Sequence, residues 1–481
     1  MISFLTALSW LVFFGALFAL VGFLFAYRTK DGLDDFIVAR NSQTSQATFY
    51  TLVATSMGTW ILFGPAESAT WGGIGAILGY ALGSLLPNLL MIPLGARIRK
   101  IMPNGHTLTE FVNARYGTSV YLFVLFIMLF YLFIGLTAGL TGIAQMVAIL
   151  APVPLWLTAS IVTFFTLLYT LYGGLKVSIF TDRIQMLVIL PFILLILVLG
   201  WQASDGFTPA LNGLQNQAPH LLNPFDSNGM QTGITFFLAV CLTGLFYQGT
   251  WQRIFAAKNN KAIRNGFIFS GLASFPIIFA LGLFGLAFVG LSLPGAGSTA
   301  LFSVILVDAP YWLLIGMIFF GLALIMSSAD STMSALQSLF IVDLYRILPS
   351  IKQQRLRLVS CILLVVTSII ATFIASQGYS ILYLFLLADL LCCAAAFPIF
   401  YGFYNSQYQS YQALLSIIGG LVAGLYYFPM PGEPVENLFE SFLLATFVPI
   451  VISLFVMLLP SKQAFDFEQL ALKVKKLKSN L

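Results

Sequence analysis

Long uninterrupted runs of apolar residues alternate with short polar segments along the whole chain. Runs of about twenty residues recur from Ser3 to Leu459, and a bilayer core requires roughly 20 apolar residues per helix. The ninth run is too long for one crossing, and we expect it to include an external lead-in near Asp308. The pattern predicts an all-α polytopic membrane protein with about 13 transmembrane spans, at 3–27, 46–71, 74–96, 118–148, 153–173, 182–201, 232–253, 265–292, 300–342, 358–376, 380–404, 410–428 and 437–460.

The composition excludes several classes of protein. Of the 481 residues, 59% are hydrophobic and only 8% are charged, whereas a soluble domain carries about 25% charged residues. Together with a mean hydropathy of +0.95, this excludes a soluble enzyme, a disordered chain and a secreted disulfide scaffold. The two histidines lie too far apart for a metal-ligand pattern, and all four cysteines fall in apolar segments, where we expect them to serve packing.

The basic residues predict how the chain crosses the membrane. All 22 lysines and arginines follow odd-numbered spans, in the loops or at the adjoining span ends, or lie in the tail. We expect the protein in the cell membrane, that is, the plasma or inner membrane. The positive-inside rule predicts that its amino terminus lies outside and its carboxyl terminus in the cytoplasm. The first span has no basic region before it, so we expect a retained helix rather than a cleaved signal peptide. The basic tail is either a topology anchor or a contact for anionic membrane lipid.

Four acidic residues are candidates for groups buried within the predicted spans, where ionisable groups are costly and usually face a cavity or a partner. They are Glu67, Asp182, Asp330 and Asp389. We expect no lysine or arginine to lie deep enough to pair with them. Asp182 begins a predicted helix, whose dipole alone could satisfy it, while Glu67 and Asp389 could be hydrogen-bonded or close to the membrane interface.

A row of hydroxyl groups follows one face of the ninth predicted span. Ser327, Ser331, Ser334 and Ser338 are spaced by three or four residues, which places them on one helical face, and Asp330 stands beside them. Small residues of this kind can serve helix packing in membranes. Hydroxyls next to a carboxylate indicate instead a site for a hard cation, which prefers oxygen ligands.

Two predicted spans contain helix-breaking residues at corresponding places. Gly58 and Gly64-Pro65 interrupt the second span, and Gly244 and Gly249 interrupt the seventh. A break frees backbone carbonyls, which is tolerable only beside a polar cavity, and paired breaks indicate the central binding site of a transporter. Because the breaks are five spans apart, they predict two inverted five-helix repeats.

The predicted organisation follows from these breaks. It comprises an extra N-terminal helix and cytoplasmic loop at 1–45, a first repeat at 46–201, an external loop at 202–231, a second repeat at 232–404, two peripheral helices at 405–460 and a basic cytoplasmic tail at 461–481.

Several segments resemble the sodium:solute symporter family. Met326-Ser-Ser-Ala-Asp-Ser331, continuing to Asp343-Leu-Tyr-Arg346, is similar to the family's sodium-site helix and its cytoplasmic end. Gly173-Gly-Leu-Lys176 and Thr181-Asp-Arg-Ile-Gln185 are similar to its loop and the helix start that follows. The resemblance implies a bound Na⁺, held by the carbonyls of Ala54, Met57 and Leu324 and the hydroxyls of Ser327 and Ser328. It also implies a second cation site at Asp182, Asp330 and Ser331; Asp330 stands where the family has serine, so this site could instead bind a proton.

The loop Pro103-Asn-Gly-His-Thr107 and the segment Tyr247–Arg253 look like the branch that carries urea and polyamines. Ile61 differs from the residue that the family's sugar transporters have at this position, so we do not expect the solute to be a sugar. The acidic residues favour a neutral or cationic nitrogenous compound, and aromatic rings could face a cation, although each ring could equally serve packing. The candidate solute contacts are Trp60, Glu67, Thr243, Tyr247, Gln248, Trp251 and Asp389.

The predicted function is sodium-coupled symport of a small polar solute by alternating access, with no enzymatic step. The expected partners are a small-molecule solute, a sodium ion and membrane lipid, and nothing indicates nucleic acid. Four alternatives stay open: proton coupling through Asp330 or Glu67, symport of an amino acid such as proline, a membrane module that senses solute without transport, and a channel. Sodium-independent, acid-stimulated uptake would identify the first of these, and flux without any coupled ion gradient would identify the last.

Overall fold

A computed structural model describes residues 2–28, 32–307, 309–430, 437–458 and 464–474. These residues form helices joined by short connections, and one isolated β-bridge links Gln43 to Ala257. The helices of the first half of the chain are α1 (Phe4–Arg28), α2 (Leu33–Val38), α3 (Ser45–Ser56), η1 (Thr59–Leu62), α4 (Gly64–Ile101), α5 (Leu108–Tyr116), α6 (Thr118–Leu150), α7 (Leu155–Ala203), α8 (Phe207–Gln217), η2 (Pro219–Leu222) and α9 (Ser227–Thr243). Those of the second half are α10 (Gln248–Ala256), α11 (Asn260–Gly290), η3 (Gly297–Thr299), α12 (Ala300–Ile305), α13 (Tyr311–Ile347), α14 (Gln353–Ala375), α15 (Ile381–Tyr401), α16 (Ser410–Tyr427), α17 (Leu438–Met457) and α18 (Glu468–Lys473).

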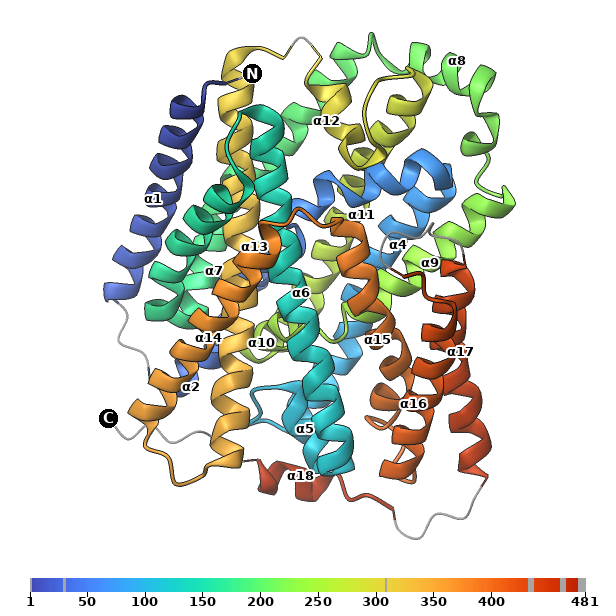
Figure 1. Ribbon diagram of the computed structural model, residues 1–481. Coiled ribbons are helices and arrows are strands. Elements are labelled where there is room, and N and C mark those ends of the chain that lie inside the picture. Colours follow the sequence, from blue (N-terminus) through green and yellow to red (C-terminus); the bar gives the residue numbers. More distant parts are fainter. Residues whose placement is uncertain (1, 29–31, 308, 431–436, 459–463, 475–481) are drawn as a thin grey trace.

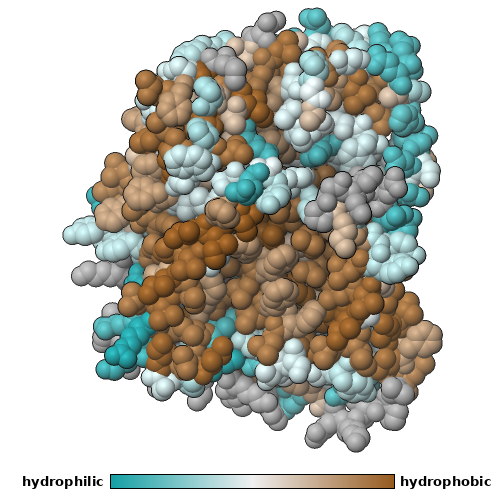
Figure 2. Space-filling model, viewed as in Figure 1, coloured by the Kyte–Doolittle hydropathy of each residue, from teal (hydrophilic) through white to brown (hydrophobic). Residues whose placement is uncertain are grey.

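The long helices stand side by side, with α8 and α12 at one end of the molecule and α2, α5 and α18 at the other (Figure 1). We refer to the latter as the α5 end. Apolar residues cover the middle of the face in Figure 2, and hydrophilic residues gather toward the two ends. This distribution is that of a protein whose middle is solvated by lipid. The protein is therefore a multi-pass membrane protein, as the hydropathy pattern predicts.

Ten helices of the described residues are long and apolar enough to cross a membrane, or 11 if α9 and α10 form one span bent by 51°. Two of these helices, α4 and α7, contain a glycine with non-helical backbone angles, Gly73 and Gly174. Each therefore comprises two arms. Counting the arms as separate spans recovers the 13 crossings expected from the sequence.

Within α7 the chain folds back at Gly174. Tyr169, before this residue, and Thr181, after it, both donate hydrogen bonds of 2.9 Å to the same oxygen of Asp330. On one straight helix these two residues would lie about 18 Å apart. Gly174 has φ +58°, and a Cβ there would lie 2.6 Å from the carbonyl oxygen of Phe36. Glycine is required because only it tolerates both the left-handed angle and this close approach.

Two spans are broken in their middle, at the places expected from the sequence. α3 ends at Ser56, and the chain passes through η1 before α4 begins at Gly64. α9 ends at Thr243 and α10 begins at Gln248. The all-α fold class with broken second and seventh spans is thus confirmed.

The ninth expected span divides as its length predicts: η3 and α12 precede the single long helix α13 at Tyr311–Ile347. The expected lead-in residue Asp308 lies outside the described residues, as do Lys475, Lys476 and Lys478 of the basic tail. The expected external loop at 202–231 contains α8 and η2.

Candidate ion and solute sites

One group of oxygen atoms joins α13 to the end of α3. The Ser327 hydroxyl lies 3.2 Å from the carbonyl oxygen of Ala54 and 3.0 Å from that of Leu324. The Ser328 hydroxyl donates to the Leu324 carbonyl at 3.0 Å. With Met57, the residue after α3, these are the five residues expected to bind sodium, and we call them the serine–carbonyl group. The fold brings Ala54 next to Ser327, which is 273 residues away in sequence.

The break at the end of α3 frees a backbone carbonyl for this group. Met57 has φ −99° and ψ 83°, which ends the helix and leaves the carbonyl of Ala54 without a helical partner. Gly58 follows, and a Cβ at this position would lie 3.1 Å from the Ser328 hydroxyl. A glycine here therefore lets the broken backbone approach α13 closely. Carbonyl and hydroxyl oxygens are the ligands that a hard cation prefers.

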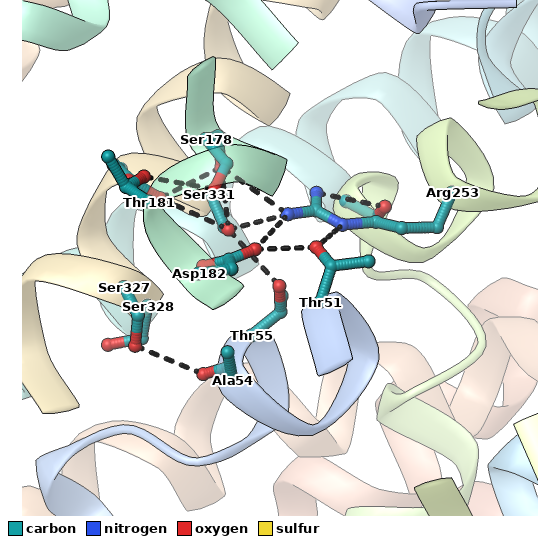
Figure 3. A network of polar contacts seen from close by, with 12 residues as sticks. Thr51, Ala54, Thr55, Ser178, Thr181, Asp182, Arg253, Ser327, Ser328 and Ser331 are labelled. Carbon is teal, nitrogen blue, oxygen red and sulfur yellow. Dashed lines mark hydrogen bonds and ion pairs between the residues drawn. The ribbon is translucent and has the colours of Figure 1, made fainter. Parts of the chain in front are cut away.

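A second cluster lies one turn further along α13, around the buried carboxylate of Asp330 (Figure 3 shows the neighbouring side chains). Its Oδ2 accepts hydrogen bonds of 2.9 Å from Tyr169 and Thr181, and its Oδ1 accepts one of 2.9 Å from Ser178 and one of 3.2 Å from Ser331. Four hydroxyl donors fill the acceptor positions of an ionised carboxylate. Hence Asp330 is held by the two arms of α7.

Asp182, the other acid of this region, pairs with an arginine. The Arg253 guanidinium donates from Nη2 to Asp182 Oδ2 at 3.3 Å, and both side chains are buried. The expectation that no basic residue lies deep enough to pair with the acids of the spans is therefore wrong. It fails because α10 runs into the interior after the break, so that Arg253 does not reach a loop at the membrane surface. Trp251 and Arg253, on this helix, are at most 1% exposed.

Arg253 also binds the hydroxyls around it. Its Nη2 donates to Ser331 at 2.6 Å and its Nε to Thr51 at 3.1 Å. Thr55, next to Ala54, approaches the Ser331 hydroxyl at 3.1 Å. Of the three residues expected to form a second cation site, Asp182 and Ser331 both bind the guanidinium (Figure 3), and Ser331 in turn binds Asp330. The pairing of Arg253 with Asp182 was not predicted, because the two residues are 71 positions apart in sequence and no local pattern connects them.

A cavity of about 190 Å³ lies next to the serine–carbonyl group. Ser328 belongs to both, and Gly58 lines the cavity and lies against Ser328, so the two sites share a wall. Among the residues that line the cavity, Asp389 is the one carboxylate, and none is a lysine, an arginine or a histidine. Four of the seven residues expected to contact solute line it, namely Trp60, Thr243, Tyr247 and Asp389.

Aromatic rings form much of the cavity wall. Trp60 stacks on Tyr80 at 5.8 Å between ring centroids and meets Phe385 edge-on at 6.4 Å. Tyr131 meets Tyr247 edge-on at 6.2 Å. Tyr80, Tyr131 and Phe385 were not singled out in the sequence, where they resemble ordinary apolar positions of a span.

The other three expected solute contacts lie elsewhere. Trp251 packs on Phe400 and donates its indole N–H to the Leu245 carbonyl at 2.8 Å. Gln248 donates to the His106 carbonyl at 3.0 Å, which ties α10 to the start of α5. Glu67 lies in the first turn of α4, partly exposed and outside the cavity lining.

A charged network closes the α5 end of the molecule. The buried His106 ring lies 2.7 Å from Asp34 and 3.4 Å from Glu110, and Arg40 binds Asp34 at 3.0 Å. Burial alone would lower the pKa of His106, but the carboxylates of Glu110 and Asp34 outweigh it and raise the pKa to about 9. Burial opposes ionisation of Asp34 as well, yet its hydrogen bonds to His106 and Arg40 hold its pKa well below the usual range.

Similarities to known proteins agree with this architecture. The sodium:solute symporter family model matches residues 36–420. A spermidine transporter of Candida albicans is 25% identical over 392 residues, covering 81% of this chain and 73% of that protein. The sodium/pantothenate symporter of Escherichia coli is 25% identical over 54% of this chain and 57% of its own length. The solved structure of a Na⁺-coupled sialic acid symporter superposes with a TM-score of 0.77 at 18% identity, covering 95% of this chain and 99% of that one.

The broken spans, the central cavity and the adjoining oxygen ligands define a secondary active transporter rather than an enzyme. The family match extends over most of the chain. The protein therefore belongs to the sodium:solute symporter family, as the resemblance of its segments indicates.

Proposed function

We propose that this protein is a sodium-coupled symporter that carries a small cationic nitrogenous solute of the polyamine type into the cytoplasm. The observation that carries the proposal is the cavity itself. It holds one carboxylate among aromatic rings and shares a wall with a group of oxygen atoms suited to sodium.

Sodium would bind at the serine–carbonyl group. The carbonyl of Ala54 comes from the broken helix α3, while Leu324, Ser327 and Ser328 belong to α13. An ion held between them would join a broken helix to an unbroken one. This fixes their relative position, so that ion binding favours one conformation of the transporter over another. Entry of the ion is driven by the membrane potential, at about 2.3 kcal/mol per charge per 100 mV.

The cavity favours a cation over an anion. Asp389 is 6% exposed and places a carboxyl group at its wall, which would pair with a bound cation. Trp60, Tyr80 and Tyr247 line the cavity, and the face of an aromatic ring attracts an ammonium group when it is desolvated. An anionic solute would find no basic side chain among the lining residues. The similarity to a spermidine transporter supports the same class of solute.

The shared wall gives a physical route for coupling. Ser328 and Gly58 contact both the cavity and the serine–carbonyl group. A solute in contact with this wall and an ion bound to the serine–carbonyl group would stabilise the same arrangement of α3 and α13. Each ligand then raises the affinity for the other by the same factor.

Orientation follows from the basic residues. With the α5 end in the cytoplasm, the network of His106, Asp34 and Arg40 would be the inner barrier. Gln252 reinforces it by donating to the carbonyl of Ile37 at 2.8 Å. Release of solute inward then requires α10 to separate from α2 and α5.

The proposal is tested by uptake of radiolabelled spermidine into proteoliposomes. An inward sodium gradient should drive accumulation above equilibrium, and a potassium or choline gradient of equal ionic strength should not. Unlabelled putrescine should compete at lower concentration than urea, proline or pantothenate. Accumulation driven by a proton gradient without sodium would contradict sodium coupling, and uptake that never exceeds equilibrium would contradict symport.

A further inference from the structure

The guanidinium of Arg253 lies where the polar side chains of four helices converge. It contacts Thr51 on α3, Ser178 and Asp182 on α7, and Ser331 on α13, while the arginine itself belongs to α10. Nη2 alone lies within 3.4 Å of three oxygen atoms, those of Ser178, Asp182 and Ser331. Thus a single positively charged group is surrounded by hydroxyl and carboxylate oxygens.

These oxygens are the ligands that a sodium ion would use. Asp182 and Asp330 are both fully buried, and a buried carboxylate in a membrane protein requires a cation or a proton. Asp330 is satisfied by four hydroxyl donors. Asp182 is not, because its Oδ1 is buried without a hydrogen-bond partner and its Oδ2 depends on Thr51 and Arg253. Asp182 is therefore the group that most needs the positive charge.

Arg253 cannot leave this position as an ion can. It is anchored by α10, where its Nη1 also donates to the carbonyl of Gly249 at 3.3 Å, and an arginine remains protonated in proteins. The neighbouring serine–carbonyl group has no such tethered charge, because its ligands are neutral oxygens. The two clusters are adjacent through Ala54 and Thr55, yet one contains its own cation.

We propose that Arg253 takes the place of a second coupling cation. Without the guanidinium, the oxygen ligands around Asp182 and Asp330 would hold a sodium ion of their own, so this transporter binds one sodium ion fewer. The inference rests on the proposed sodium coupling. It deepens that proposal by giving the number of ions: one, at the serine–carbonyl group.

The test is equilibrium binding of ²²Na⁺ to purified protein in detergent, with choline replacing sodium at constant ionic strength. The wild type should bind one ion per chain. Arg253→Gln removes the charge and keeps an amide donor, and it should bind one ion more than the wild type. Arg253→Lys keeps the charge and should bind the same number as the wild type. Arg253→Gln combined with Asp182→Asn should return to the wild-type number.

The outcomes separate this inference from the proposed function. A wild type that binds two ions, or a folded Arg253→Gln variant that gains none, overturns the role of Arg253. A wild type that binds no sodium overturns the proposed sodium coupling, while a gain of one ion in Arg253→Gln would still support the role of Arg253.

A further variant keeps the test decisive if Arg253→Gln does not fold. Asp330→Asn in the wild-type background should leave one bound ion with unchanged affinity, because no sodium binds beside Asp330. Loss of an ion in this variant would overturn the inference.

Discussion

The hydroxyl of Ser327 on α13 lies 3.2 Å from the carbonyl oxygen of Ala54 on α3. The first residue belongs to an unbroken helix and the second to the last turn of a broken one. This contact links two carbonyls and two hydroxyls in one hydrogen-bonded group, and Ser328 connects the proposed ion site to the wall of the cavity.

Ser328→Ala should weaken the binding of sodium without unfolding the protein. Loss of one ligand oxygen is expected to raise the half-saturating sodium concentration about tenfold, which corresponds to about 1.4 kcal/mol. Sodium-dependent stabilisation against heat measures this directly, because a ligand that binds the folded state raises the melting temperature. Ser334→Ala is the matched control, since this buried serine lies further along α13 and outside the serine–carbonyl group. Equal sodium affinity in both variants would remove Ser328 from the site.

Asp389→Asn should impair the transport of a polyamine selectively. A hydrogen bond to a charged group contributes about 1.5–3 kcal/mol, so we expect the KM for spermidine to rise about 10- to 100-fold while sodium binding persists. Glu67→Gln is the comparison variant, because Glu67 does not line the cavity. Spermidine kinetics that change in Glu67→Gln and not in Asp389→Asn would place the solute elsewhere.

The stability of the protein should fall as the pH rises through about 9. The pKa of His106 is raised to about 9 in the folded protein, against about 6.5 in an unfolded chain. The stabilisation from protonated His106 is therefore fully present below pH 6.5 and is lost as the pH passes 9, an effect of up to about 3 kcal/mol. Melting temperatures from pH 6 to pH 10 would show it. His106→Gln should flatten this dependence, and an identical slope in the variant would contradict the assignment.

Gly174→Ala should destabilise the protein more than Gly206→Ala does. Both glycines have positive φ, +58° and +86°, and a left-handed angle costs a non-glycine residue about 1–2 kcal/mol. Only at Gly174 would the added Cβ also collide with the backbone oxygen of Phe36, at 2.6 Å. The amount of folded protein recovered from membranes and its melting temperature measure the difference. Similar losses in the two variants would show that the left-handed angle, and not the close approach of α2, dominates.

The amino-acid sequence by itself determined the membrane class, the 13 crossings and the two broken spans. These features depend on local properties: the hydropathy of about twenty consecutive residues, the low helix propensity of Gly58 and Gly244, and Pro65, which lies in the first turn of α4; Gly249, also predicted to interrupt the seventh span, lies inside α10. The five residues of the serine–carbonyl group came from the resemblance of their segments to a known family, and the fold joins four of them, Ala54, Leu324, Ser327 and Ser328, through hydrogen bonds.

Only the tertiary structure decided which polar residues meet. Arg253 was expected among the basic residues that follow a span, but α10 carries it inward to Asp182. Trp251 and Gln248 resemble solute contacts in the sequence, yet their indole and amide groups bind Leu245 and His106. These outcomes depend on the direction that the chain takes after a break and on distances between segments far apart in sequence. Hydrophobic periodicity does not encode either quantity, because it reports the environment of one helix at a time.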